Sequence, residues 1–484
     1  MYKNKSLSAL ATSLMLGCYV LISGCTVGPD FKKPTPPESS NNYTRETVLT
    51  DGSSQVVDVN QAIPKDWWTL FESAELNQFV KEALNNNPSV QVAQTSLRVA
   101  KENTLAQFAS FFPNAQVGYS KSRQQDPVGT VAPTMANNAP IYSLNSSSLN
   151  VGFVPDVFGL NRRTVEALKA QETIQRNQIT ATYLTLAANT ASSLIQEASL
   201  QDQIKETRKL IEINQNALSL IKKQADSGGA NGLDISTQES LLSQLEQALP
   251  PLQKQLEIYR DQLAVLTGNA PSQKKFTDLS LSQFSLPQTL PNKIPSKLVE
   301  QRPDVKAAEA YVHASSAQVG IALANRLPQF SITAAFGGVA NGFGQMFDKG
   351  NRFWGLEGGV SQNIFDFGAL KHKQRAAEAA LDQSSALYRQ TVLTAFQNVA
   401  DTLYSLDSDQ KAINAALNSE AVAQKTLTIV QSQLDAGDVN IFAIWTAQTA
   451  YHQAKINVVQ AKAQQYIDTV ALFQSLGGSW NNEL

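Results

Sequence analysis

The sequence predicts an α+β membrane protein in which short β-hairpins from three chains close a twelve-stranded barrel, four strands per chain, and long helices continue the barrel as a coiled-coil tunnel. Three observations lead to this fold class: an internal duplication, two hairpin-like segments in the chain, and two helical patterns of 67 residues each. Each of these features depends on the spacing of residue types along the chain of 484 residues. The segments of the chain follow in order from the N-terminus.

The N-terminus has the composition of a secretory signal. Lys3 and Lys5 precede an apolar stretch over residues 7–22, which ends in Ser23-Gly24-Cys25. A basic start, a short apolar run and small residues before the cleavage site define such signals. The ending also resembles a bacterial lipobox, in which the cysteine becomes the lipidated first residue. Residues 1–24 are therefore predicted to be a lipoprotein signal peptide, and Cys25 is predicted to be lipidated.

Residues 25–63 are predicted to form a lipidated N-terminal tether, because they are polar and rich in Pro, Ser and Asn. Beyond the signal, no run of about 18 uninterrupted apolar residues occurs, so no transmembrane helix is predicted. Any crossing of a membrane must then use strands in a closed barrel, since unpaired backbone groups are too costly in lipid.

The rest of the chain repeats itself. Residues 87–90 match residues 302–305 at an offset of 215, and a later set of matches has an offset of 209. Agreement at a constant offset over whole segments indicates a duplication. The predicted copies span residues 64–280 and 281–484. The later matches pair Gln224, Asp226, Gly228, Asn231 and Ile235 with Gln433, Asp435, Gly437, Asn440 and Ile444.

Each copy contains a predicted β-hairpin. A helix ends at Pro113 or Pro328, and two alternating segments follow, separated by a loop rich in Gly, Asn and Pro. Alternation bounded by turn residues is typical of paired strands. The predicted strands are residues 115–122 and 149–154 in copy one, with a loop at 123–148. In copy two they are residues 330–337 and 354–361, with a loop at 338–352.

A very long helix follows each hairpin. Residues 160–226 and 369–435 contain no Pro and no Gly, so each would span roughly 100 Å. Apolar residues recur every seven positions, which is typical of a coiled-coil seam. After Gly228-Gly229 and Gly437, second helices return over residues 233–268 and 441–476. The copy-two ladder contains Val392, Val399, Leu406, Ile413, Leu427 and Leu434, interrupted by Glu420; the copy-one ladder contains Ile204, Ile211, Leu218 and Ala225.

The number of strands requires several chains. Four strands cannot close a membrane barrel, because such barrels begin at about eight strands. Two chains would supply eight strands, and the interior of an eight-stranded barrel is filled by its own side chains. Three chains supply twelve strands, which leave a lumen. The long helices carry charged and amide residues throughout, so they must project into an aqueous compartment. The chain is therefore predicted to form a homotrimer with a barrel and a helical tunnel.

Several motifs resemble the outer membrane factor (TolC-like) family, and more narrowly the lipoproteins of RND-type multidrug efflux systems. The resemblance covers essentially the whole chain and rests on the start at 25–31, Trp67-Trp68, Asp156-Val157-Phe158-Gly159 and residues 364–368. It implies a twelve-stranded barrel in the outer membrane and a twelve-helix tunnel in the periplasm. It also implies docking onto a periplasmic adaptor protein and an inner-membrane RND-type pump, which would supply the energy.

No catalytic or metal-binding constellation stands out. His313, His372 and His452 are isolated in helical patterns and lack the spacing of metal ligands, so they are expected to be structural. Charged residues make up only 17% of the chain and the net charge is −2, so a nucleic-acid partner is not expected. Neither an enzyme nor a cofactor is predicted.

The turns between the paired long helices carry the one site hypothesis. Related channels often place carboxylates at the closed periplasmic tip, where a ring of acids selects cations and holds the gate. Asp234 stands at such a position, but copy two has Ala443 and Thr446 where acids are often found. The other interpretation is that these are ordinary turn residues, since Asp and Gly favour turns. The candidate gate residues are Asp226, Asp234, Asp435 and Asp438, in turns formed by Gly228, Asn231, Gly437 and Asn440.

The sequence as a whole indicates a passive outer-membrane duct that exports drugs or other small toxic compounds from the periplasm to the exterior. One alternative is the outer-membrane duct of a type I protein secretion system. A more distant one is a structural coiled-coil lipoprotein, which would explain the helices and the anchor but not the two hairpins.

Overall fold

A computed structural model describes residues 26–37, 43–45, 55–58, 63–125, 141–291, 298 and 301–478. The predicted signal peptide and Cys25 lie outside the described residues. The chain divides into two compact units, and each takes segments from both copies of the duplication. Of the described residues, those within 26–34, 97–174 and 308–388 form the strand unit. Those within 35–96, 175–307 and 389–478 form the helical unit.

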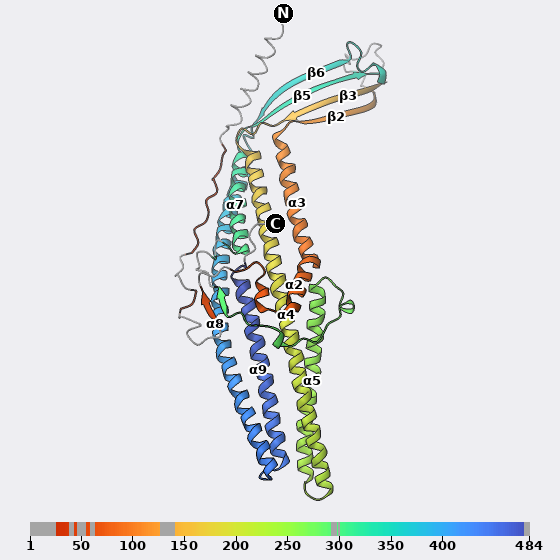
Figure 1. The fold of residues 1–484 in the computed structure, drawn as a ribbon. Helices are drawn as coiled ribbons and strands as arrows, with labels where there is room; N and C mark the ends of the chain where they lie inside the picture. The colour runs from red at the N-terminus through yellow and green to blue at the C-terminus, as the bar shows by residue number, and fades with distance from the viewer. Residues whose placement is uncertain are drawn as a thin grey trace, which may run out of the picture. The chain divides into compact units, whose positions relative to one another are not determined.

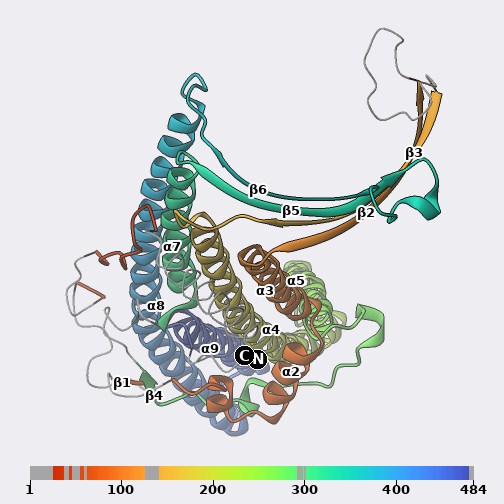
Figure 2. The same ribbon diagram turned by 90° about the horizontal axis from the view of Figure 1, so that it is seen from above.

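Four antiparallel strands form the sheet of the strand unit, in the order β2-β3-β5-β6 (Figure 2). Each copy supplies one hairpin, and β3 of copy one pairs with β5 of copy two. The prediction of two hairpins in one chain is therefore confirmed. The strands are β2 (Asn114–Gln125), β3 (Ile141–Phe153), β5 (Gln329–Ala340) and β6 (Arg352–Ser361).

The hairpin loops were predicted too long. β2 continues to Gln125 and β3 begins at Ile141, so much of the predicted loop 123–148 is strand. Ser and Asn make up most of residues 143–148, and these residue types suggest a loop by composition. Their backbone groups nevertheless pair with β2, for example Asn145 with Lys121, since the ladder needs no particular side chain. In copy two, β5 extends to Ala340 and the connection contains the short helix η5 (Phe343–Gln345).

A helix that begins with proline precedes each hairpin. These helices are α3 (Pro88–Phe108) and α7 (Pro303–Ala324). Proline suits the first helical position, because the N–H it lacks would have no partner there. The short helix η2 (Ala109–Phe111) follows α3, and both helical segments end before Pro113 and Pro328, as predicted.

The two long helices begin at the glycines that the sequence indicated. α4 (Leu160–Asp226) has 67 residues and α8 (Ala369–Ala436) has 68. Gly159 and Gly368 precede them with φ angles of +82° and +85°, which favour glycine. Carboxylates cap both first turns: Asp156 accepts from the N–H of Asn161, and Asp366 accepts from the N–H of Leu370.

In the helical unit each long helix pairs with a shorter returning helix, α4 with α5 (Gly232–Leu266) and α8 with α9 (Ile441–Ser475) (Figure 1). The copy-two ladder is confirmed where it is best packed, since Val392, Val399 and Leu406 are fully buried. Ile413 is 8% exposed, and the lower members of the ladder are partly buried. The helices therefore pack along the seven-residue seam.

The copy-one ladder was predicted in the wrong register. Ile204 is buried, but Ile211 and Leu218 are only partly buried. The buried positions alternate at spacings of four and three, as a coiled-coil seam requires. Polar side chains occupy half of them, which is why the apolar pattern did not reveal them. The seam consists of Gln203, Thr207, Leu210, Asn214, Ala217 and Ile221.

Aromatic side chains form part of the core of the helical unit. Trp67 and Phe71 of η1 (Trp67–Phe71) are fully buried, and the Trp67 ring stacks on Phe473 of α9 at 5.3 Å. α2 (Ala74–Asn86) follows η1 and buries Leu76 and Val80. Smaller elements complete the fold: β1 (Val56–Asp58), which pairs in parallel with β4 (Thr289–Pro291), and the short helices η3 (Pro271–Gln273) and η4 (Leu281–Gln283).

None of the helices in the described part of the chain has an apolar stretch long enough to cross a membrane.

Candidate functional site

One face of the four-stranded sheet is apolar across all four strands. Strand pairing sets Val117 of β2 opposite Leu149 of β3, which faces Phe336 of β5, which faces Trp354 of β6. The next row contains Ala115, Val151, Ala334 and Leu356. Val117, Trp354 and Leu356 are 76%, 79% and 72% exposed in the single chain. Large apolar side chains standing in rows on an open sheet indicate a surface that is covered by lipid or another apolar phase.

The opposite face is largely polar or small, with Leu144, Val339 and Phe353 as exceptions. Residues one step along the strands point the other way, and these rows contain Gln116 with Asn150, and Ser120 with Ser146. Strands with one apolar and one hydrated face are typical of membrane barrels that enclose water. The strands are 10 to 13 residues long, close to the roughly 9–11 residues that span a bilayer.

The outer strands leave the sheet open. Among the described residues, β2 pairs only with β3 and β6 pairs only with β5. Each of these strands therefore presents one row of backbone N–H and C=O groups that pairs with no other strand in the described part of the chain. Such an edge is not tolerated in lipid, because every backbone polar group must be paired there. The sheet is thus built to pair with further strands.

At the copy-one tip, α4 turns into α5 through residues 227–231. Gly228 has a φ angle of +77°, and the N–H of Gly229 donates to the carbonyl of Gln224 at 2.7 Å. Asn231 caps α5, since its side chain accepts from the N–H of Asp234. Asp234 in turn accepts from the N–H of Asn231 at 2.9 Å, which completes a capping box. The carboxylate of Asp234 is therefore engaged in holding the turn.

The copy-two tip repeats the backbone of this turn without the second half of the cap. Gly437 has a φ angle of +80°, and the N–H of Asp438 donates to the carbonyl of Gln433 at 2.8 Å. Asn440 caps α9 by accepting from the N–H of Ala443. Ala443 stands where copy one has Asp234, so the reciprocal hydrogen bond is missing. The two tips share geometry but differ in charge.

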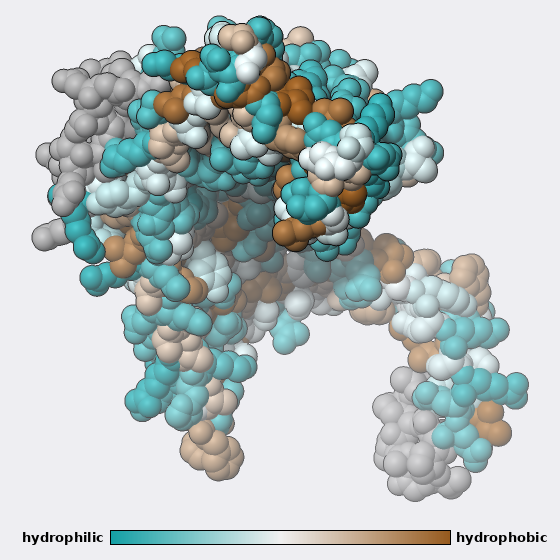
Figure 3. Space-filling model, turned by 90° about the horizontal axis from the view of Figure 1, so that it is seen from below, coloured by the Kyte–Doolittle hydropathy of each residue, from teal (hydrophilic) through white to brown (hydrophobic). Residues whose placement is uncertain are grey.

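The four candidate gate acids are all exposed in the single chain. Asp234 bonds within its own turn, and Asp435 accepts from the side chain of Gln431 one helical turn earlier. Among the described residues, no hydrogen bond joins the side chain of Asp226 or Asp438 to any other of the four acids. Figure 3 views the helix ends that lie at the bottom of Figure 1 from below, and both hydrophilic and hydrophobic residues occur on that face.

A buried carboxylate higher in the helical unit was missed from the sequence. The side chain of Glu206 on α4 is only 7% exposed and accepts from Nδ1 of His452 at 2.6 Å. It also accepts from Nζ of Lys209 and of Lys455. Burial alone would raise its pKa, but these three donors outweigh burial and lower it to about 2. His452 and Lys455 lie on α9, so no local motif could have revealed the cluster.

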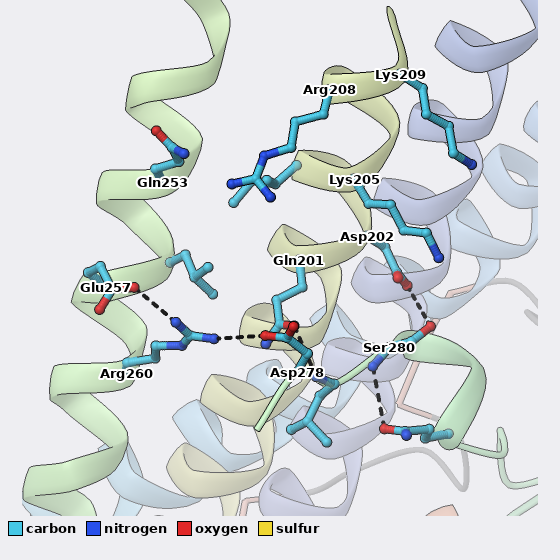
Figure 4. A pocket seen from close by; sticks show the side chains of 14 residues that line it. Gln201, Asp202, Lys205, Arg208, Lys209, Gln253, Glu257, Arg260, Asp278 and Ser280 are labelled. Carbon is cyan, nitrogen blue, oxygen red and sulfur yellow. Dashed lines mark hydrogen bonds and ion pairs between the residues drawn. The ribbon is translucent and has the colours of Figure 1, made fainter. Parts of the chain in front are cut away.

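A polar groove of about 680 Å³ lies between α4, α5 and the segment that contains Asp278 and Ser280 (Figure 4). Arg260 of α5 binds the buried Glu197 at 3.1 Å and also contacts Glu257 and Asp278. Burial raises the pKa of Glu197, and the contact with Arg260 opposes that shift. On the other side, Asp202 accepts from the hydroxyl of Ser280. Internal ion pairs and hydrogen bonds thus brace this groove.

Among the described residues, no group of three or more His, Cys, Asp or Glu side chains is placed to hold a metal ion. His313 and His452 each contact a glutamate, Glu166 and Glu206 respectively. Both pairs join segments that are distant in sequence, so these two histidines contribute to packing in the structure.

Comparisons with known proteins agree with this architecture. Residues 79–269 and 294–478 match the family model described as "Outer membrane efflux protein". The pyoverdine export outer membrane protein OpmQ of Pseudomonas putida is 27% identical over 427 residues, which cover 87% of this chain and 89% of that protein. The toluene efflux pump outer membrane protein TtgF of Pseudomonas putida is 27% identical over 483 residues, which cover 97% of each.

The fold is that of solved outer-membrane channels. The CmeC outer membrane channel of Campylobacter jejuni has a TM-score of 0.84 at 20% identity, and the match covers 94% of this chain and 95% of that one. The outer-membrane channel OprN has a TM-score of 0.82 at 24% identity, and the match covers 95% of this chain and all of that one. The predicted fold class is confirmed. From the family match over most of its length, this chain belongs to the outer membrane efflux protein family.

Proposed function

We propose that three copies of this chain form a passive duct across the outer membrane, through which small toxic compounds leave the periplasm. The observation that carries the proposal is the sheet, whose apolar rows run across all four strands and whose two outer edges are open. Three such sheets, paired edge to edge, supply twelve strands and a lumen lined by the polar face. The apolar rows, including Val117 and Trp354, then face lipid.

The helical unit extends this duct on the periplasmic side in our proposal. Its long helices carry charged and amide side chains along their length, and polar residues such as Gln203 and Asn214 occupy part of the seam. Such helices suit a wall between two aqueous spaces. The duct itself performs no chemistry, and an inner-membrane RND-type pump with a periplasmic adaptor protein would supply energy and choose the cargo.

Small molecules are the cargo favoured by the relatives. Proteins similar over nearly their whole length are described as exporting pyoverdine and toluene. A type I protein secretion duct is the alternative. The two are separated by deleting the gene from its host and restoring it on a plasmid. Small-molecule efflux predicts that the deletion raises sensitivity to lipophilic drugs and solvents and leaves the secreted proteins unchanged. Loss of one secreted protein with unchanged drug sensitivity would favour secretion instead.

The predicted anchor belongs to the same proposal. Cleavage after Gly24 and acylation of Cys25 would attach each chain to outer-membrane lipid. Mass spectrometry of the N-terminal peptide of the membrane-extracted protein tests this directly. An acylated peptide that begins at Cys25 is expected, and an unmodified or uncleaved N-terminus would refute the anchor.

We also propose that the tip carboxylates line the periplasmic entrance, where they favour cations. Asp226, Asp234, Asp435 and Asp438 are exposed, and both tip turns lie at the same end of the helical unit (Figure 1). In a trimer these carboxylates would occur three times each around one axis. Single-channel recording of the reconstituted protein tests both the duct and its selectivity. A complete absence of conductance steps under conditions that open the entrance would contradict the duct.

A further inference from the structure

The segment that directly follows the predicted lipid-bearing cysteine is held against the strand unit rather than hanging free. The N–H of Val27 donates to the carbonyl of Phe158, just before α4 begins. Further along, Lys33 forms an ion pair with Glu309 of α7 at 3.2 Å. Residues 26–33 therefore contact both copies of the duplication, the turn before α4 in copy one and α7 in copy two.

Arg163 is the centre of these contacts. Its side chain is only 4% exposed, and its guanidinium donates to the backbone carbonyls of Val27 and Gly28. It also pairs with the carboxylates of Asp30 and Glu166, each at 2.8 Å. A guanidinium offers five donors in a fixed planar arrangement, so it suits a site that must hold a backbone and two carboxylates together.

The backbone of the segment approaches the helices as closely as glycine allows. Gly28 has a φ angle of +93°, and a Cβ atom there would lie 2.4 Å from Cα of Gly320 on α7. A Cβ atom on Gly159 would lie 2.7 Å from a methyl carbon of Thr26. Gly28 and Gly320, on facing elements, thus permit one close backbone contact. Gly159 leaves room for Thr26, the residue next to Cys25. The segment is thus packed closely on this surface.

An aromatic contact completes the arrangement. The ring of Phe31 stacks on the imidazole of His313 with centroids 4.2 Å apart. The same imidazole bonds to Glu166 at 2.9 Å, and Glu166 pairs with Arg163. The stack, the hydrogen bond and the ion pair therefore form one continuous network from Phe31 back to Arg163.

We propose that residues 26–33 form a clasp, centred on Arg163, which fixes the height at which the acyl chains of Cys25 enter the outer membrane. The inference rests on the proposed lipidation. Thr26, the residue joined to Cys25, packs against Gly159, since a Cβ atom there would lie 2.7 Å from its methyl carbon. Gly159 lies between the end of β3 and the start of α4. The anchor then enters the bilayer beside the junction of strand and helix, and Arg163 is the residue that positions it.

The test uses a spin label at Lys32, an exposed position within the clasp. The sequence contains only Cys18 and Cys25, and Cys18 would leave with the signal, so Lys32→Cys would be the only free thiol of the mature, acylated chain. The full-length protein is reconstituted into phospholipid nanodiscs. Electron paramagnetic resonance then reports label mobility, and collision with oxygen or a water-soluble nickel complex reports depth. The clasp predicts one immobilised component at one depth.

Arg163→Gln should convert most of the signal to a mobile component and broaden the depth distribution, while Arg163→Lys should retain part of the immobilised signal. Because Arg163→Gln removes a buried cation and could prevent folding, a second variant changes only the segment, Asp30→Asn with Phe31→Ala, and should have the same effect. Lys169→Gln is the matched control on the same helix, since Lys169 lies six residues further along α4 and is exposed.

A mobile label in the otherwise unchanged protein, or an immobilised label at unchanged depth in the segment variant, would overturn the clasp. The acyl mass on Cys25 is measured separately on the same samples. An absent acyl group would refute the proposed anchor, whereas the mobility of the label would still report whether the polypeptide clasp exists.

Discussion

Nδ1 of His452 lies 2.6 Å from Oε2 of Glu206, and this contact joins α9 of copy two to α4 of copy one. Neither residue has a counterpart in the other copy. At the offset of 209, Glu206 corresponds to Ala415 and His452 corresponds to Ser243. The contact between His452 and Glu206 therefore joins the two copies through residues at which their sequences differ.

Replacing Glu206 by Gln should destabilise the helical unit by about 3 kcal/mol, because it removes a buried carboxylate that holds three cationic or hydrogen-bonding side chains. The pKa of Glu206 is lowered from 4.5 to about 2. A lowered folded-state pKa stabilises the protein above the unfolded pKa and ceases to do so as the pH falls through the folded pKa. Thermal unfolding of the wild type should therefore lose this contribution between about pH 4.5 and pH 2.

Comparing the melting temperatures of the variant and the wild type across pH tests whether the Glu206 charge causes this pH dependence. Glu206→Gln should melt lower than the wild type at pH 7, and the difference should shrink as the pH approaches 2. Glu239→Gln is a matched control, since Glu239 forms an exposed ion pair with Lys222 near the copy-one tip. Exposed pairs contribute little, so its melting temperature should hardly change. A difference that stays constant from pH 7 to pH 2 would contradict the role of the Glu206 charge.

Val117→Lys should impair insertion, because it places a charge in the apolar rows of the sheet. A lysine facing lipid costs about 2–4 kcal/mol near the middle of the bilayer and less near its surface. Gln116→Lys is the matched control, since the neighbouring position faces the polar side. The yield of heat-modifiable oligomer on unboiled gels measures the effect. Equal yields for the two variants would argue against the assignment of the faces.

Gly228→Ala should weaken the copy-one tip by roughly 1–2 kcal/mol, since an L side chain is disfavoured at a φ angle of +77°. Nothing lies within 4 Å of a Cβ atom at this position, so the cost is purely that of the backbone. Gly232→Ala is equally free of contacts, but its φ angle is not positive and it opens α5. Hydrogen exchange of the turn amides should rise in the first variant only.

The gate hypothesis is tested by Asp234→Asn and Asp438→Asn in single-channel recordings. Loss of a carboxylate at a cation-selective entrance should reduce the preference for cations, with Asp438 giving the clearer result. Asp234 also caps α5, so its variant changes the turn as well as the charge. Unchanged cation selectivity in both variants would leave these residues as turn residues only.

Gly28→Ala should release the clasp, because the added Cβ atom would meet Cα of Gly320. Trypsin should then cut after Lys32 faster than in the wild type, as the segment leaves the surface. Gly344→Ala is the matched control, since a Cβ atom there meets nothing within 4 Å. Identical cleavage rates in the wild type and Gly28→Ala would show that the close contact does not hold the segment.

Much of the fold was visible in the sequence because the signals were local. Glycine and proline marked helix ends, so α4 was placed at residues 160–226, as observed. The strands were found from alternation, but β3 was predicted eight residues too short, because Ser and Asn at 143–148 suggest a loop by composition although their backbone groups pair with β2. The copy-one seam was missed for a related reason, since Asn214 is 2% exposed yet polar. It is held by hydrogen bonds to Leu210 and Gln238.

The sequence by itself determined the duplication, the hairpins, the lengths of the helices and the positions of the tip turns, because these follow from spacing and from the backbone preferences of Gly, Pro and Asp. Only the tertiary structure decided which polar residues lie inside. Glu206 and Arg163 are ordinary charged residues in the sequence. Apart from Lys209 and Glu166, which lie three residues away, their partners come from segments more than 100 residues away, and burial among those partners makes them structural centres.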